Sequence, residues 1–171
     1  MLRLGGSVLG FSSDESSSVK KGETLADTIR TVSNYADLIV IRHDKDGAAK
    51  LAQKFSKVPI INAGSGAQEH PTQGLLDCLT IRHLKGTIDS LNVGLIGDLK
   101  YGRTVHSLAI FLSYFKTNQY FISPEQLSMQ HRVIEHLVRR QTLFKETKRF
   151  HQTLDILDVI YMTRIQKEAV S

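Results

Sequence analysis

The sequence predicts an α/β protein in which parallel sheets are flanked by helices. Short apolar runs rich in β-branched residues alternate along the chain with amphipathic patterns of helical period. The runs are almost continuously apolar, which is typical of strands covered by helices on both faces. In addition, several of these runs end in polar or charged residues, as strands do where an α/β sheet meets its ligand.

Each element follows from its local pattern. Leu25, Ile29 and Val32 recur on one helical face, and Pro71 suits the first turn of a helix. Similar patterns predict helices at 23–36, 46–55, 71–84, 103–115 and 124–140. The apolar runs predict strands at 7–11, 37–42, 58–62, 92–98, 119–123, 142–146 and 158–162.

The composition is that of an ordinary globular protein. The chain has 171 residues, of which 41% are hydrophobic, enough for one core or for two small subdomains that share one. A polar break at 85–90 is the expected subdomain boundary. Cys78 is the single cysteine, which excludes a disulfide framework and indicates a reducing compartment. Neither a signal peptide nor an apolar run of membrane-spanning length is present, so a cytoplasmic protein without membrane contact is expected.

The charge balance is basic, with a formal net charge of +5 and a pI near 9.4. Nucleic acid, an anionic membrane surface or a small anionic ligand would each suit such a chain. The densest basic stretch, 131–152, places its charges between helically spaced apolar residues, as an ordinary solvated helix face does. No array of base-stacking aromatic residues, zinc-finger spacing or RNP-like motif is found, and no nucleic-acid partner is expected.

Polar residues follow the carboxyl ends of the predicted strands. Because ligands of open α/β sheets bind beyond these ends, the side chains there are expected to meet in one crevice. Cations outnumber carboxylates among them, which indicates an anionic ligand. They are Arg42, His43, Asn62, Asp98, Arg103, Arg164 and Gln166.

The segment "NAGSGAQEHPTQ" (62–73) leaves two interpretations open. His70 precedes Pro71 at a predicted helix start, so the free N–H groups of the first turn would favour an anion or a polarised carbonyl oxygen. Alternatively, Gln73 completes a capping-box-like arrangement and the segment is only a turn and a cap. Arg103 also begins a helix, where the helix dipole disfavours a cation, and this placement points to an anionic partner.

Other chemistries find no support in the sequence. No Ser/His/Asp or Cys/His arrangement stands out, and no metal-ligand spacing such as His-x-x-x-His occurs. A site that orients and polarises anionic substrates remains, with no cofactor and no metal.

Together, these segments closely resemble the aspartate carbamoyltransferase catalytic chain, in the aspartate/ornithine carbamoyltransferase superfamily. Five segments occur in the same order as in that family: "VKKGETLADTI", "RHDKDGAA", "NAGSGAQEHPTQ", "GDLKYGRTVHSL" and "YMTRIQKE". The likeness covers essentially the whole chain. His-Pro-Thr-Gln is shared with ornithine carbamoyltransferases, whereas the "KKGET", "DLKYGRTVHSL" and "TRIQKE" segments are similar to the aspartate enzyme.

The resemblance implies transfer of the carbamoyl group from carbamoyl phosphate to the amine of L-aspartate, in pyrimidine biosynthesis. Arg42 and His70 would be catalytic and would polarise the carbonyl oxygen, while Gln73 would hold the carbamoyl amide. The residues implied for aspartate binding are Lys21, Arg103, Arg164 and Gln166. Ser17 and Lys21 would lie on a loop shared with a neighbouring subunit of a homotrimer, to which regulatory chains could be added.

The resemblance also implies segments that this sequence does not contain. The family's Ser-Thr-Arg-Thr phosphate loop and His-Pro-Leu-Pro loop are both absent from it. A catalytic chain truncated at both ends is therefore expected, with two incomplete subdomains of the carbamoyltransferase type. They are a partial carbamoyl-phosphate-binding domain at 1–86 and a partial aspartate-binding domain at 87–171. Little activity is expected from this chain alone. The alternatives are a catalytically dead remnant or assembly partner, and a carbamoyltransferase for another amine such as ornithine.

Overall fold

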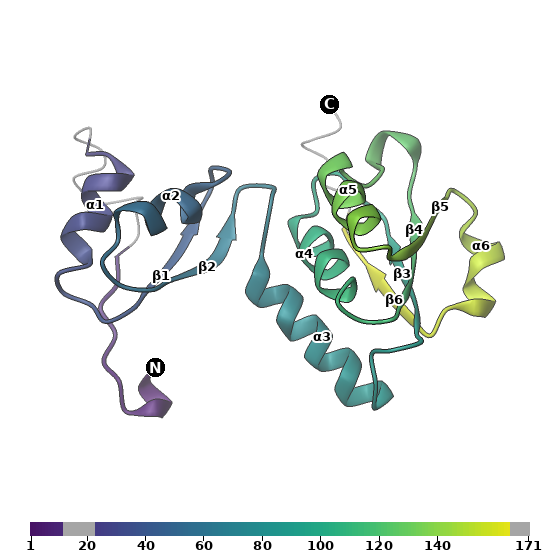
Figure 1. Ribbon diagram of the computed structural model, residues 1–171, viewed down its shortest axis with the longest axis horizontal. Helices are drawn as coiled ribbons and strands as arrows, with labels where there is room; N and C mark the ends of the chain where they lie inside the picture. The colour runs from purple at the N-terminus through teal and green to yellow at the C-terminus, as the bar shows by residue number, and fades with distance from the viewer. Residues whose placement is uncertain (12–22, 165–171) are drawn as a thin grey trace. The chain divides into compact units, whose positions relative to one another are not determined.

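The computed structural model describes residues 1–11 and 23–164 (Figure 1). Its contacts divide the chain into two compact units, each made of two segments. The first unit comprises Met1–Ile39 and Lys50–Ile61, and the second comprises Val40–Ala49 and Asn62–Ser171. No helix in the described part of the chain is both long enough and apolar enough to cross a membrane.

Helix α1 (Leu25–Val32) dominates the first unit, together with most of α2 (Ala48–Phe55). Thr24 caps α1, because its side chain accepts a hydrogen bond from the backbone N–H of Asp27 at 3.2 Å. The Arg30 guanidinium lies 4.5 Å from the centre of the Phe55 ring, which joins the two helices. A two-stranded sheet pairs β1 (Ile39–His43) with β2 (Ile60–Ser65).

The second unit is built on a four-stranded sheet in the order β5-β4-β3-β6, with every pair parallel. Figure 1 shows α4 and α5 packed beside this sheet and α3 alongside α4. The strands are β3 (Asn92–Ile96), β4 (Asn118–Ile122), β5 (Leu143–Thr147) and β6 (Val159–Met162). The helices are α3 (Pro71–Lys85), α4 (Arg103–Leu112), α5 (His131–Arg139) and the short α6 (Phe150–Thr153).

The hydrophobic core of this unit lies between the sheet and its helices. β3 is buried along almost its whole length, as its unbroken apolar sequence predicts for a central parallel strand. Residues from β4, α4 and α5 pack against it, and burial of such side chains contributes about 1.5–3 kcal/mol each. The largest buried apolar side chains are Leu95, Leu99, Leu108, Leu112, Phe121 and Leu137.

Most predicted helices and strands are present, with ends that differ by a few residues. The predicted strand at 7–11 is wrong: Val8, Leu9 and Phe11 are 62%, 83% and 63% exposed, and no strand pairs with them. The predicted helix at 124–140 is shorter, since Glu125–Leu127 forms a 3-10 turn after Pro124 and α5 begins only at His131. Two further 3-10 turns, Leu2–Leu4 and Leu154–Ile156, and α6 were not expected.

Candidate functional site

The loop that joins β2 to α3 depends on two glycines. Gly64 has φ +122° and Gly66 has φ +50°, in the region that side chains rarely adopt. A Cβ atom at Gly66 would lie 1.9 Å from Oδ1 of Asp46. That same oxygen accepts a hydrogen bond from the backbone N–H of Ala67 at 2.8 Å. The glycines therefore let the loop turn tightly against the residues that follow β1.

His70 is the N-cap residue of α3, with Pro71 in the first helical position, as expected. Its backbone N–H donates to the Ser107 hydroxyl at 2.8 Å, and its ring Nδ1 lies 3.3 Å from the Thr72 hydroxyl. The alternative of a capping box is wrong, because no side chain caps α3. Gln73 instead donates from Nε2 to the carboxylate of Asp77 at 2.9 Å.

Arg103 is the first residue of α4 and lies against the β2–α3 loop. Its Nη1 donates to the carbonyl oxygen of Gly66 at 2.9 Å, and its guanidinium carbon would be 3.2 Å from a Cβ on Gly64. Burial lowers the pKa of Arg103, and the nearby charge of Arg42 lowers it further. Two arginines from different segments are thus near enough for their charges to interact, and the meeting of the strand ends in one crevice stays a prediction.

His70 belongs to the same cluster. Burial lowers the pKa of its imidazole, and the positive charges of Arg103 and Arg42 lower it further, more than the charge of Asp77 raises it. The ring is therefore neutral at pH 7. Neither Arg42 nor Arg103 forms an ion pair within 1–11 and 23–164. Like charges held together without a carboxylate partner are characteristic of an anion-binding site.

Besides Arg103, Arg164 is the one predicted aspartate-binding residue that the structure describes. Arg164 is exposed and follows Thr163, whose hydroxyl accepts a hydrogen bond from the backbone N–H of Asp98 at 2.7 Å. No hydrogen bond or ion pair joins Arg164 to Arg42, His70 or Arg103 in the part of the chain that the structure describes. Ser17, Lys21 and Gln166 lie outside the described residues.

Sequence reasoning missed the residues that hold the β2–α3 loop in place. His106 is fully buried on α4, and its Nε2 lies 2.8 Å from the carbonyl oxygen of Leu99. Arg132, which the sequence assigned to a solvated helix face, donates to the carbonyl oxygen of Gln68 and lies 3.3 Å from Nδ1 of His106. A histidine inside the apolar pattern of α4 was the one available signal for this anchor.

The site therefore offers hydrogen-bond donors and positive charge at one place. Arg42, Arg103 and the first turn of α3 could bind an anion, and the neutral imidazole of His70 could donate to a carbonyl oxygen. The described residues contain no group of three or more His, Cys, Asp or Glu side chains placed to hold a metal ion.

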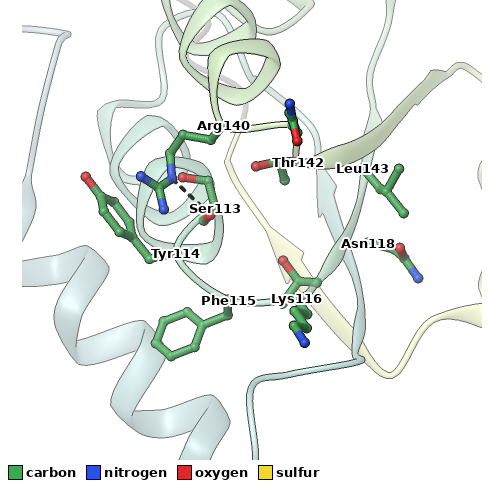
Figure 2. Close-up of a pocket in the computed structure, with 10 residues that line it drawn as sticks. Ser113, Tyr114, Phe115, Lys116, Asn118, Arg140, Thr142 and Leu143 are labelled. Atoms are coloured by element: carbon green, nitrogen blue, oxygen red, sulfur yellow. Dashed lines mark hydrogen bonds between the residues drawn. The ribbon is translucent and has the colours of Figure 1, made fainter.

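A separate pocket of about 360 Å³ lies where β4 and β5 begin, and contains none of the predicted site residues. Figure 2 shows Arg140 stacked on Tyr114, with 3.9 Å between the guanidinium carbon and the ring centre. Nε of Arg140 also donates to the carbonyl oxygen of Ser113 at 3.1 Å. Because the Arg140 guanidinium is already engaged by Tyr114 and Ser113, this pocket is not a better candidate for the functional site.

Comparison with known proteins gives matches along nearly the entire chain. Residues 1–83 match the family model "Aspartate/ornithine carbamoyltransferase, carbamoyl-P binding domain", and residues 89–170 match the "Asp/Orn binding domain" of the same family. The aspartate carbamoyltransferase catalytic subunits of Thermococcus gammatolerans and Methanocella arvoryzae are 56% and 57% identical over 98% and 97% of the chain. These matches cover 54% of each relative, so the chain spans about half the length of the relatives it matches.

Solved structures agree with these relatives. The aspartate transcarbamoylase of Trypanosoma cruzi, in complex with aspartate and phosphate, is 44% identical with a TM-score of 0.90, over 99% of this chain and 56% of that one. The catalytic subunit of M. jannaschii aspartate transcarbamoylase is 51% identical with a TM-score of 0.87, over the same shares. The chain belongs to the aspartate/ornithine carbamoyltransferase family.

Proposed function

We propose that this chain carries catalytic residues for the transfer of a carbamoyl group from carbamoyl phosphate to the amine of L-aspartate. The observation that supports this most is the cluster of Arg42, His70 and Arg103, where the charges of two arginines, neither of them ion-paired among the described residues, lower the pKa of the imidazole. Both substrates are anions, which such a cluster would attract. The T. cruzi relative has been crystallised with carbamoyl phosphate and with aspartate, which adds to the proposal.

In this reaction the aspartate amine attacks the carbamoyl carbon, a C–N bond forms, and the C–O bond to phosphate breaks. The amine loses a proton to the departing phosphate. Arg42 and His70 stabilise the negative charge that develops on the carbonyl oxygen. If Nδ1 of His70 accepts a hydrogen bond from the Thr72 hydroxyl, the neutral ring carries its proton on Nε2. This N–H then donates to the carbonyl oxygen of the substrate.

The remaining residues bind and orient the two substrates. Gln73 holds the amide end of the carbamoyl group, and Arg103, Arg164 and Gln166 bind the aspartate carboxylates. Arginine suits this role because its planar guanidinium can donate two parallel hydrogen bonds to one carboxylate. Lys21 and Ser17 act in the site of a neighbouring subunit.

Binding of the bisubstrate ligand N-(phosphonacetyl)-L-aspartate to the chain joined to the flanking segments of a Thermococcus relative, measured by calorimetry, tests the site directly. We expect Arg42→Ala and Arg103→Ala each to weaken binding by about 10- to 100-fold, since each removes charged hydrogen bonds of about 1.5–3 kcal/mol. Arg82→Ala is the matched control, because Arg82 is exposed on α3 and forms no ion pair in the described chain. Equal binding by all three variants would remove the cluster from the site.

Turnover tests the reaction and its amine substrate. We expect little or no carbamoyl-aspartate from the 171-residue chain alone, because its sequence has no Ser-Thr-Arg-Thr loop to bind phosphate. Joined to the flanking segments of a Thermococcus relative, the chain is expected to carbamoylate aspartate and not ornithine. In that form His70→Ala should lower kcat by about 100- to 1,000-fold, as loss of an oxyanion donor does elsewhere. Robust turnover by the chain alone, or a preference for ornithine, would contradict the proposal.

The same proposal extends to assembly. We infer a carbamoyl-phosphate-binding part at 1–86, an aspartate-binding part at 87–171, a homotrimer to which regulatory chains could bind, and a cytoplasmic location in pyrimidine biosynthesis. Mixing His70→Ala and Lys21→Ala versions of the extended protein tests the shared site. Subunits that exchange should recover activity in the mixture, because some sites then contain neither substitution. No recovery despite exchange would argue against a shared site.

A further inference from the structure

Asp77 determines which way the side-chain amide of Gln73 faces. The two residues are four apart on α3, and Nε2 of Gln73 donates to Oδ1 of Asp77 at 2.9 Å. A carboxylate can only accept hydrogen bonds, so the amide must turn its NH₂ group toward Asp77. The carbonyl Oε1 of Gln73 is then directed away from Asp77. No donor in the described chain bonds to it, and it is not among the buried atoms without a partner.

The carboxylate of Asp77 is enclosed more than an ordinary surface pair would be. Its second oxygen, Oδ2, is buried. Tyr161 of β6 lies near it: burial raises the pKa of the phenol, the Thr104 hydroxyl lowers it, and the charge of Asp77 and a hydrogen bond with its side chain raise it again. Asp77 is thus held by Gln73 on its own helix and by Tyr161 of the sheet, which fixes the position of its carboxylate.

We propose that Asp77 is a positioning residue that fixes Oε1 of Gln73 as an acceptor, and so makes the site prefer an acyl phosphate with an amine on its acyl carbon. This inference rests on the proposed function, in which Gln73 faces the carbamoyl amide. A carbamoyl NH₂ donates to Oε1, whereas a methyl group in its place leaves this acceptor without a partner. With the Gln73 amide rotated, two NH₂ groups would face each other and the preference would be lost.

Two stable analogues isolate this effect from the rest of the site. Phosphonoacetamide and acetonylphosphonate share the phosphonate and the carbonyl oxygen, and differ only in having NH₂ or CH₃ on the carbonyl carbon. Arg42 and His70 face groups that both analogues possess. The charge of Asp77 also raises the pKa of His70, so its removal changes binding of both analogues alike. An amide oxygen accepts hydrogen bonds more strongly than a ketone oxygen, so the donors to the carbonyl also contribute to the ratio of the two dissociation constants. The change in this ratio between the wild type and an Asp77 variant is therefore what reports on the Gln73 amide.

Calorimetric titration of the extended protein, in which the chain is joined to the flanking segments of a Thermococcus relative, with each analogue tests the proposal. The wild-type chain is expected to prefer phosphonoacetamide by about tenfold, as a site built to bond an N–H does. Asp77→Asn, which has the same shape but lets the Gln73 amide rotate, should reduce that preference to about threefold or less. Asp77→Glu keeps an acceptor at this position and should retain most of the preference, as should the control Asp155→Asn, an exposed carboxylate in the Leu154–Ile156 turn.

The outcomes separate this inference from the proposed function. A wild-type preference that Asp77→Asn leaves intact would overturn the role of Asp77 while the site for carbamoyl phosphate stands. Loss of the preference in Asp77→Glu as complete as in Asp77→Asn would also overturn it, because a retained acceptor would then not matter. If the extended protein without substitutions binds neither analogue, the proposed function and this inference both fail. Gln73→Met, which removes the acceptor without introducing charge, should abolish the preference even if Asp77→Asn does not fold.

Discussion

Replacement of Gly74 by alanine is expected to destabilise the chain, although the same change stabilises most helices. Gly74 lies in the first turns of α3, where this helix packs on α4. A Cβ atom there would lie 2.7 Å from Cδ2 of Phe111 and 3.1 Å from the backbone carbonyl carbon of Ser107. The Phe111 ring can rotate, but the backbone at Ser107 cannot move without displacing α4.

Two opposing contributions set the magnitude. In an open helix, alanine is more stable than glycine by about 1 kcal/mol. Overpacking of a close contact costs about 1–3 kcal/mol. Because the contact includes backbone, we expect the upper part of that range, and a net loss of about 1–2 kcal/mol. For a chain of this size, that corresponds to a fall in Tm of about 3–6 °C.

Urea unfolding followed by circular dichroism measures this change, and an unchanged slope with urea shows that the unfolded state is the same. Thr80→Ala is the control, since Thr80 is exposed on α3 and should change stability by less than about 0.5 kcal/mol. In the double variant Gly74→Ala/Phe111→Leu, the smaller side chain should restore part of the loss. A Gly74→Ala chain more stable than wild type would refute the close contact between α3 and α4.

Three further predictions concern stability and reactivity. Burial lowers the pKa of His106 below its ordinary 6.5, so the free energy of unfolding should be highest above pH 6.5 and fall as the pH drops below it. A His106→Asn chain should show a smaller fall in the free energy of unfolding, and an equal fall would contradict this. Burial raises the pKa of the Cys78 thiol to about 11, so at pH 8 Ellman's reagent should label the native chain at least tenfold more slowly than the urea-unfolded chain, and equal rates would count against burial. Gly66→Ala should lower the urea midpoint, because its Cβ would lie 1.9 Å from Oδ1 of Asp46, whereas Gly5→Ala, also at positive φ but with no atom within 4 Å, should lower it less.

The sequence predicted the strands of the second unit well because most of them have a clear apolar pattern. β3 and most of β4 are apolar runs between turn signals, and burial of these apolar residues follows from composition, whereas the full burial of Gln119 in β4 does not. The run at 7–11 has the same composition, yet no strand pairs with it. A local pattern indicates that a segment can form a strand, but not whether another strand is available to pair with it.

The site was predictable to the extent that it follows strand ends and helix starts. Arg42, His70 and Arg103 were predicted this way, because topology brings such positions together, and their charges interact in the structure. Arg132 was not, because its contact with Gln68 joins residues far apart in sequence and leaves no periodic trace. The pairing of Gln73 with Asp77 was within reach, since a separation of four residues on a helix always places two side chains side by side.

The hydrogen bonds of the β2–α3 loop also limit which ligands its backbone can bind. Four of its carbonyl oxygens, those of Gly66, Gln68, Glu69 and His70, already accept hydrogen bonds from within the protein. Calcium and magnesium ions bind through oxygen ligands, and carbonyl groups are among the commonest. The backbone N–H groups of 66–70 also donate within the protein. The loop backbone is therefore largely used up by its own fold, and what remains for an anion at this place is the side chains around it, chiefly Arg42 and Arg103.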